Sequence, residues 1–165
     1  MSRAPFVLAL LNGVHDRTTF NSGSAPWDRY LRKQVTQDIR RRVAACFVAT
    51  TDGKRIAGYY TLASASLLLG ELPASIAKKL PRYPTVPTVR MGRLAIDQGF
   101  KGQGLDSALL ADALSRAARS EVAAYALMVD AKYDAAANFY RHHGFIALPD
   151  SSRRLFLPLA TVQAL

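Results

Sequence analysis

A strand that runs through a glycine-rich loop directly into an amphipathic helix constrains the fold of this chain most strongly. The strand is predicted over Val89–Ile96, and the loop contains Gly102 and Gly104. A helix is predicted over Gln103–Arg119, because its apolar residues recur at helical spacing on one face and charged residues occupy the other. Such a turn points backbone N–H groups and the positive end of the helix dipole at one place, which predicts an anion-binding site.

The other apolar runs predict strands and helices on both sides of this unit. Asp52–Gly53 lies between two β-branched and aromatic runs, which indicates a hairpin. Strands are predicted at Phe6–Leu11, Val43–Thr50, Arg55–Ala65, Ala124–Val129, Phe145–Leu148 and Leu155–Leu159, and helices from Pro26 to about Arg42, at Pro73–Leu80 and at Ala135–His142. This alternation predicts an α/β fold with a mixed sheet and helices on both faces.

Length and composition favour one globular domain over residues 1–165, since no repeat, linker or low-complexity tract is found. There are 22 Lys/Arg against 12 Asp/Glu, a formal net charge of +10. A domain this basic is expected to attract nucleic acid, acidic membranes or a phosphate-rich cofactor, although ordinary surface charge explains the excess equally well. No apolar stretch approaches the ~20 residues of a membrane span, so we expect a cytoplasmic protein without a membrane partner.

The cysteine and histidines do not indicate metal or disulfide chemistry. Cys46 is the one cysteine and lies in an apolar run, which favours a buried, unreactive thiol over a nucleophile. His15, His142 and His143 lack the spacing of metal ligands, and no Cys pair completes a zinc site. We therefore predict no metal.

Two familiar phosphate motifs do not fit the glycine-rich loop. A dinucleotide fingerprint requires a third glycine where Ser107 stands, and the Gly-Lys-Ser/Thr of a nucleotide triphosphate loop is absent. Taken alone, the glycines also allow a tight strand–helix turn that binds no ligand.

Three segments together resemble the GNAT family of N-acetyltransferases. Lys101–Asp106 is similar to that family's Arg/Gln-x-x-Gly-x-Gly/Ala loop, and Gly92–Asp97 looks like its fourth strand. Downstream, Ala136–Phe145 matches its A-x-x-F-Y-x-x-x-G-F segment, in the expected order and separation. The resemblance implies the GNAT fold, with a mixed, mostly antiparallel sheet, and acetyl-CoA as the acetyl donor.

The resemblance also implies which residues contact acetyl-CoA. The family's loop grips the pyrophosphate, and backbone groups of its fourth strand bind the pantetheine arm. Carried over, the cofactor-binding residues are Leu94, Ala95, Ile96, Lys101, Gly102, Gln103, Gly104, Leu105, Asp106, Ser107 and Asn138. Asp106 departs from this pattern, since the family usually has Gly or Ala at that position. A carboxylate there is stabilised by the helix dipole but repels a pyrophosphate.

Tyr140 stands where the family's general acid donates a proton to the coenzyme A sulfur. A phenol with a pKa near ~10 is protonated at neutral pH and can protonate a thiolate. The alternative is a purely structural tyrosine of the last helix. No Asp or Glu is indicated as a general base.

The resemblance covers nearly the whole chain and extends to the GNAT toxins of bacterial toxin–antitoxin pairs. It is carried by segments such as His15–Phe20, Arg29–Leu31, Gly58–Leu62, Leu80–Pro84 and Arg154–Leu159. It implies acetylation of the α-amino group of aminoacyl-tRNA, which blocks translation. It also implies a ribbon-helix-helix antitoxin that binds operator DNA, and it leaves a homodimer open.

Basic residues agree in sign with a tRNA substrate. The predicted nucleic-acid-binding residues are Arg29, Arg32, Lys33, Arg40, Arg41, Arg82, Arg90 and Arg93. Arg90 and Arg93 flank the cofactor strand and are the strongest individual candidates for contacts with the acceptor's terminal phosphates. Two alternatives stay open. One is an acetyltransferase of protein N-termini, polyamines or small amines, and the other is a non-catalytic GNAT-derived binding module.

Overall fold

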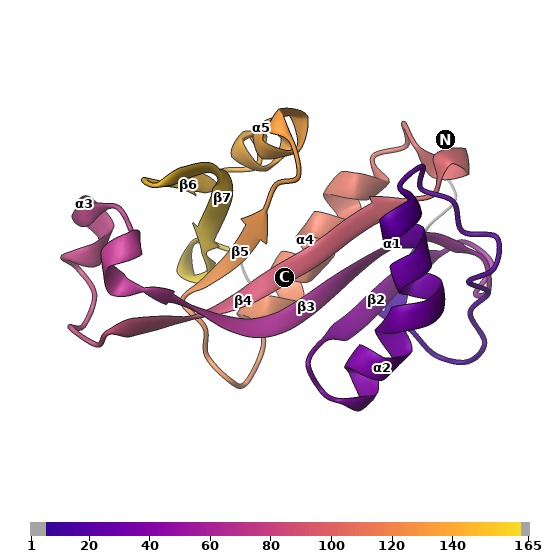
Figure 1. The fold of residues 1–165 in the computed structure, drawn as a ribbon, viewed down its shortest axis with the longest axis horizontal. Helices are drawn as coiled ribbons and strands as arrows, with labels where there is room; N and C mark the ends of the chain where they lie inside the picture. The colour runs from indigo at the N-terminus through magenta and orange to yellow at the C-terminus, as the bar shows by residue number, and fades with distance from the viewer. Residues whose placement is uncertain (1–5, 163–165) are drawn as a thin grey trace. The chain divides into compact units, whose positions relative to one another are not determined.

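The computed structural model describes residues 6–162, and its seven strands follow the hydrogen-bonded order β1-β2-β3-β4-β5-β7-β6 (Figure 1). The strands are β1 (Val7–Leu10), β2 (Ala45–Thr50), β3 (Ile56–Leu68), β4 (Thr85–Ile96), β5 (Ala126–Asp130), β6 (Ile146–Leu148) and β7 (Ser151–Pro158). Strands β4 and β5 run parallel, whereas β1–β2, β2–β3, β5–β7 and β6–β7 are antiparallel. This confirms the predicted mixed, mostly antiparallel sheet.

Five α-helices and several short turns join the strands. The helices are α1 (Ala25–Arg29), α2 (Val35–Arg40), α3 (Ala74–Ala77), α4 (Leu105–Ala118) and α5 (Asp134–His142) within the described residues. A π-helical turn, Tyr30–Gln34, connects α1 to α2, and 3₁₀ turns occupy Leu69–Glu71, Gln98–Phe100 and Leu159–Thr161. Among residues 6–162, no helix is both long and apolar enough to cross a membrane.

The chain divides into two compact units. Unit 1 contains residues 1–63 and 92–113, and unit 2 contains residues 64–91 and 114–165. Strands β3 and β4 and helix α4 each contribute residues to both units. One domain over 1–165 stays a prediction.

The core of unit 1 gathers around β2, β3 and the α1–α2 segment. Tyr59, Leu31 and Val35 are fully buried in one apolar cluster. Gly58 of β3 is required by close packing, because a Cβ there would lie 2.9 Å from Leu109 Cδ1 and 3.1 Å from the Ala95 carbonyl oxygen. The face of α4 that the sequence predicts as apolar, including Leu109, is therefore held against the sheet.

The helical segment predicted to open at Pro26 runs from Ala25 to Arg40 and includes a π-helical turn between α1 and α2 that the sequence did not predict. A π turn advances more residues per turn than an α-helix, so the buried positions Tyr30, Leu31 and Val35 lie on one side. Helix α2 ends in a Schellman arrangement, in which the Val43 N–H donates to the Asp38 carbonyl and Arg42 adopts a left-handed φ of 59°.

The core of unit 2 is formed by β5 and its neighbours. Residues Ala126–Val129 are buried, as the continuous apolar run predicts. Ala126 and Met128 belong to one apolar cluster, which also contains Leu67, Val86 and Phe156. Helix α5 ends at His142, and Gly144 closes it with a left-handed φ of 91°, which confirms the predicted terminating glycine. Strand β4 begins four residues earlier than predicted, since the Pro87 carbonyl accepts a hydrogen bond from the Tyr125 N–H despite the proline.

Candidate active site

The glycine-rich loop has the open backbone that an anion site needs. Gly102 and Gly104 have φ of 80° and 76°, a left-handed conformation that strains residues with a side chain. A Cβ at either position would meet nothing within 4 Å, so the surface beside the loop is open. Helix α4 begins immediately afterwards at Leu105, and the first N–H groups of a helix lack intrahelical partners. The loop therefore fits a phosphate group.

Asp106 occupies part of this N-terminal turn with its own carboxylate. Its Oδ1 accepts a hydrogen bond of 2.7 Å from the Ser107 N–H, and the residue is exposed. A negative charge is stabilised at this end of the helix dipole. An incoming phosphate meets both the repulsion of this carboxylate and its competition for a backbone donor.

Strand β4 carries the three predicted pantetheine-binding residues at its end. The parallel ladder pairs Thr88–Met91 with Ala126–Val129, and β4 continues beyond it to Ile96. Within Leu94–Ile96, Ala95 is buried and its two neighbours are half-buried. The Asp97 N–H, which follows directly, donates to the Ala57 carbonyl and fixes the exit of the strand.

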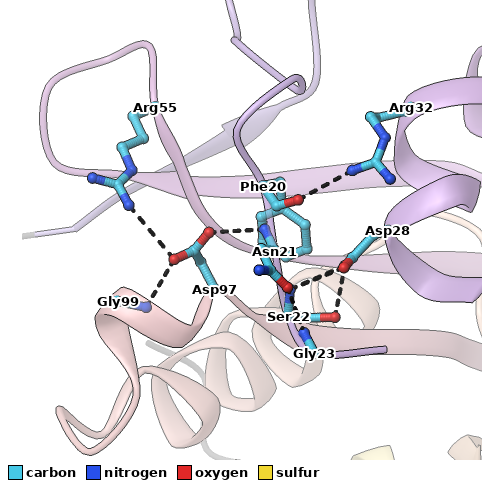
Figure 2. Close-up of polar contacts among 9 residues, drawn as sticks. All are labelled: Phe20, Asn21, Ser22, Gly23, Asp28, Arg32, Arg55, Asp97 and Gly99. Atoms are coloured by element: carbon cyan, nitrogen blue, oxygen red, sulfur yellow. Dashed lines mark hydrogen bonds and ion pairs between the residues drawn. The ribbon is translucent and has the colours of Figure 1, made fainter. Parts of the chain in front are cut away.

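A group of polar residues that the sequence reasoning missed surrounds the start of the loop (Figure 2). Asp97 is 4% exposed, and its carboxylate accepts from the Gly99 N–H at 2.8 Å and the Asn21 N–H at 2.9 Å. Lys101, predicted to face the pyrophosphate, donates from Nζ to the Ser22 carbonyl at 3.0 Å. No local pattern predicts the contacts to Asn21 and Ser22, because their partners lie nearly 80 residues away in the chain.

Helix α5 places Tyr140 in an aromatic setting in unit 2. Its ring lies 5.3 Å from that of Phe139 and 5.4 Å from that of Phe145, and the residue is 8% exposed. Burial raises the pKa of Tyr140 well above its ordinary value, so its phenol stays protonated at neutral pH. Asn138 on the same helix is exposed, and its side-chain oxygen accepts from Arg141 at 2.9 Å.

Basic residues of α1, the π turn and α2 are largely available to a ligand. Four of them are exposed and have no ion pair within residues 6–162: Arg29, Lys33, Arg40 and Arg41. Arg32 donates to the Phe20 carbonyl at 3.1 Å. The Arg93 guanidinium lies 3.5 Å from the centroid of the Tyr30 ring, whose hydroxyl donates to Asp38.

Several arginines of unit 2 form ion pairs with acids, namely Arg90, Arg153 and Arg154. Arg90 lies 3.0 Å from Asp130, and Arg154 contacts both Asp130 and Glu71, at 3.5 and 3.2 Å. Arg82 is exposed in the loop before β4. Two of the eight predicted nucleic-acid-binding residues, Arg82 and Arg90, belong to this unit.

The cysteine is buried in the core of unit 1, as predicted. Burial raises the pKa of Cys46 to about 12, so its thiol is un-ionised at neutral pH and is a poor nucleophile. Within residues 6–162, no group of three or more His, Cys, Asp or Glu is arranged to hold a metal ion.

The mixed seven-stranded sheet and the left-handed glycine loop that opens α4 fit an acetyl-CoA-dependent acetyltransferase. The chain belongs to the GNAT acetyltransferase family, since the model of the acetyltransferase (GNAT) domain matches residues 17–156.

Within this family, the chain is similar to known toxins. The chain is 34% identical over 157 residues to the tRNA-acetylating toxin of Mycobacterium tuberculosis (strain ATCC 25618 / H37Rv), covering 94% of this chain and 93% of that protein. Its structure is similar to AtaT complexed with acetyl-methionyl-tRNAfMet, with a TM-score of 0.88, 29% identity and coverage of 96% and 97% of the two chains. It is also similar to AtaTR bound with acetyl-CoA, with a TM-score of 0.81, 26% identity and 95% coverage of each chain.

Proposed function

We propose that this protein transfers an acetyl group from acetyl-CoA to the α-amino group of aminoacyl-tRNA and thereby blocks translation. The similarity to a tRNA-acetylating toxin over 94% of the chain carries this proposal. The unpaired basic residues of α1 to α2 agree with it, because a tRNA is held largely through its phosphates. A polyamine or small-amine acceptor gives no reason for such a cationic surface.

Acetyl-CoA supplies the thioester-activated acetyl group. We assign its pyrophosphate to residues 101–107, with the backbone N–H groups near Gly102 and Gly104 as donors. The pantetheine arm is assigned to the backbone of Leu94–Ile96, where β4 extends beyond its ladder with β5. Asn138 on α5 completes the proposed set.

Tyr140 is the proposed general acid. Its hydroxyl Oη keeps its proton at neutral pH because burial disfavours the phenolate. It is therefore suited to protonate a leaving thiolate, which is the charge that develops when the thioester is broken.

The proposed acceptor surface is centred on Arg29, Lys33, Arg40 and Arg41. Their exposed side chains are free to contact phosphates. Arg32 and Arg93 belong to the same unit but already contact Phe20 and Tyr30, so we expect them to fix the position of the acceptor rather than supply most of the affinity. Arg82 and Arg90 are assigned peripheral contacts.

We also propose that the protein acts in the cytoplasm as the toxin of a toxin–antitoxin pair. Its antitoxin would be a ribbon-helix-helix protein that binds operator DNA, and a homodimer is part of the same proposal. The family resemblance and the toxin relative support this assignment. Co-purification with the product of an adjacent small gene, followed by light scattering of the toxin alone, tests both statements.

The decisive experiment uses radiolabelled acetyl-CoA and three acceptors: total charged tRNA, the same tRNA after deacylation, and spermidine. We expect label only on charged tRNA, and alkaline hydrolysis should release it as an N-acetyl amino acid. Label on spermidine without label on charged tRNA would replace this proposal with the small-amine alternative.

A further inference from the structure

Three hydrogen bonds connect the loop at residues 20–22 to the turn that precedes the pyrophosphate loop. The Asn21 N–H donates to Asp97 Oδ2 at 2.9 Å, and the Gln98 N–H donates to the Asn21 carbonyl at 2.8 Å. The third runs from Lys101 Nζ to the Ser22 carbonyl at 3.0 Å. All these residues belong to unit 1.

Asp97 is the centre of this arrangement, as Figure 2 shows. Its side chain is buried, and a buried carboxylate is tolerated only when hydrogen bonds compensate its lost hydration. One carboxylate oxygen accepts from the Asn21 N–H in the 20–22 loop, and the other accepts from the Gly99 N–H in the turn. The carboxylate therefore fixes two backbone segments relative to each other.

Arg55 supports the same carboxylate from the surface. Its guanidinium lies 3.6 Å from Asp97 Oδ1 and 5.1 Å from the centroid of the Phe100 ring, the last residue of the 3₁₀ turn. About half of the Arg55 side chain is exposed, so removing it does not leave a cavity.

The far side of the loop is held separately. Asp28 of α1 is buried and accepts hydrogen bonds from the Ser22 N–H and hydroxyl, the latter at 2.7 Å. Arg32 donates to the Phe20 carbonyl. Asp28 is thus a second buried carboxylate that binds the same loop, and within residues 6–162 its side chain forms hydrogen bonds with Ser22 and none with residues 97–101.

We propose that Asp97 is a positioning residue for the acetyl-CoA site: it holds the 97–101 turn, and through it the pyrophosphate loop, in the conformation that binds the cofactor. Gly102 follows this turn directly, so a displacement of residues 97–101 moves the backbone donors of the loop. This inference rests on the proposed cofactor assignment. It adds that Asp97, an aspartate outside the proposed set of cofactor-binding residues, controls the affinity for acetyl-CoA.

The test compares Asp97→Asn with Asp28→Asn. The amide at position 97 points an NH₂ group at one of the two N–H donors and loses that hydrogen bond. The loss of a charge-assisted bond predicts an acetyl-CoA Kd and KM raised about tenfold, with kcat at saturating acetyl-CoA within about twofold of wild type. Arg55→Ala should raise the acetyl-CoA Kd about two- to threefold, and it remains informative if Asp97→Asn does not fold.

Asp28→Asn is the matched control, since it removes a similarly buried charge that binds the same loop from its other side. Its acetyl-CoA Kd should stay within about twofold of wild type, although its stability falls. A purely structural role for Asp97 predicts instead that both variants lose active enzyme, with kcat reduced and the acetyl-CoA KM unchanged. That result, or an equal rise in the acetyl-CoA Kd for Asp28→Asn, would overturn the proposal.

Calorimetry of acetyl-CoA binding separates this inference from the proposed function. If wild-type protein binds acetyl-CoA but does not acetylate charged tRNA, the proposed acceptor is wrong, while the Asp97→Asn Kd still decides the positioning role. If the tRNA reaction proceeds and Asp97→Asn binds acetyl-CoA as tightly as wild type, only the positioning role fails.

Discussion

The two units of the molecule carry equal net charge but use their charged residues differently. Unit 1 has 12 Lys/Arg and 7 Asp/Glu, and unit 2 has 10 and 5, so each has a formal net charge of +5. In unit 2, acids such as Asp130 and Glu71 pair with arginines. In unit 1, Asp28 and Asp97 bind mainly backbone N–H groups, with Arg55 beside Asp97. Within residues 6–162, the exposed basic residues of the α1–α2 segment, Arg29, Lys33, Arg40 and Arg41, form no ion pair.

This difference assigns distinct tasks to the two units. Unit 1 shapes its loops with buried carboxylates and leaves its cations to bind phosphates. Unit 2 pairs several of its arginines with acids, and its main proposed contribution to the reaction is the single hydroxyl of Tyr140. Net charge alone therefore does not locate an anion-binding surface, because the partners of each cation decide whether it is available.

Replacing Tyr140 with Phe tests the contribution of unit 2 and has the largest expected effect. Only the hydroxyl is lost, so the ring contacts with Phe139 and Phe145 remain, while kcat should fall by roughly 10²–10⁴-fold because the proton donor is gone. Acetyl-CoA binding should not change. Single-turnover transfer and calorimetry measure the two quantities.

Tyr133→Phe is the matched control, because it removes the hydroxyl of an exposed tyrosine at the start of the same helix. Its kcat should equal that of wild type. The raised pKa of Tyr140 adds a pH test: the acid form persists as pH rises through ~10, so titration of this residue should produce no fall in rate between pH 7 and 10. An unchanged kcat for Tyr140→Phe would make the tyrosine structural.

Arg40 and Arg90 test whether ion pairing decides which basic residues bind tRNA. Arg40→Ala removes an unpaired cation, so tRNA affinity should fall roughly fivefold and the slope of log K against log salt should decrease by ~1. Arg90→Ala should change both quantities less, because Asp130 already neutralises much of the Arg90 charge. Filter binding of charged tRNA across a salt series measures both variants. Equal slopes for the two would show that ion pairing in unit 2 does not withdraw Arg90 from the ligand.

Local sequence chemistry was sufficient to predict most of the fold. The spacing of leucines in α4, the continuous apolar run of β5 and the Asp-Gly hairpin each depend on neighbours within a few residues. The π turn at Tyr30–Gln34 depends on which side chains the core of unit 1 accepts, so the periodicity of the sequence does not reveal it. The early start of β4 likewise depends on a partner, Tyr125, that is distant in the chain.

The candidate site divides in the same way. Its glycine loop and helix start are contiguous in sequence and were predicted as an anion site. The Asp97–Asn21 contact spans 76 residues and the Arg154–Glu71 pair spans 83, so no spacing rule indicates either. For this reason the sequence predicts the loop proposed to bind the cofactor but not the contacts that hold it in place. It also favours Arg90 as a phosphate contact, because its pairing with Asp130 cannot be predicted from spacing.

Asp106→Gly tests whether unit 1 relies on backbone donors for the pyrophosphate. The wild-type carboxylate occupies the Ser107 N–H and repels phosphate. At an effective dielectric of ~20, the repulsion between the carboxylate and the phosphate is on the order of 1 kcal/mol. Removing the carboxylate should therefore lower the acetyl-CoA Kd by about fivefold. Calorimetry at low and high salt measures the gain, which should shrink as salt screens the charge. Equal or weaker binding by the glycine variant would mean that the carboxylate turns away when the ligand binds.

The smallest expected effect concerns Arg42, which follows α2 in the basic segment of unit 1. Its left-handed φ of 59° costs a residue with a side chain about 1–2 kcal/mol, whereas glycine adopts it freely. Glycine also gains roughly 0.5–1 kcal/mol of entropy in the unfolded chain, so Arg42→Gly should raise the free energy of unfolding by only about 0.5 kcal/mol.

Arg41→Gly is the control: the helical φ of −79° at Arg41 gives glycine no advantage, so this variant should be less stable than wild type. Urea unfolding measures both, with an unchanged m-value expected for each. If Arg42→Gly is also less stable than wild type, the wild-type Arg42 side chain makes contacts that outweigh the backbone strain. Arg42 would then contribute to the stability of unit 1 as well as to its positive charge.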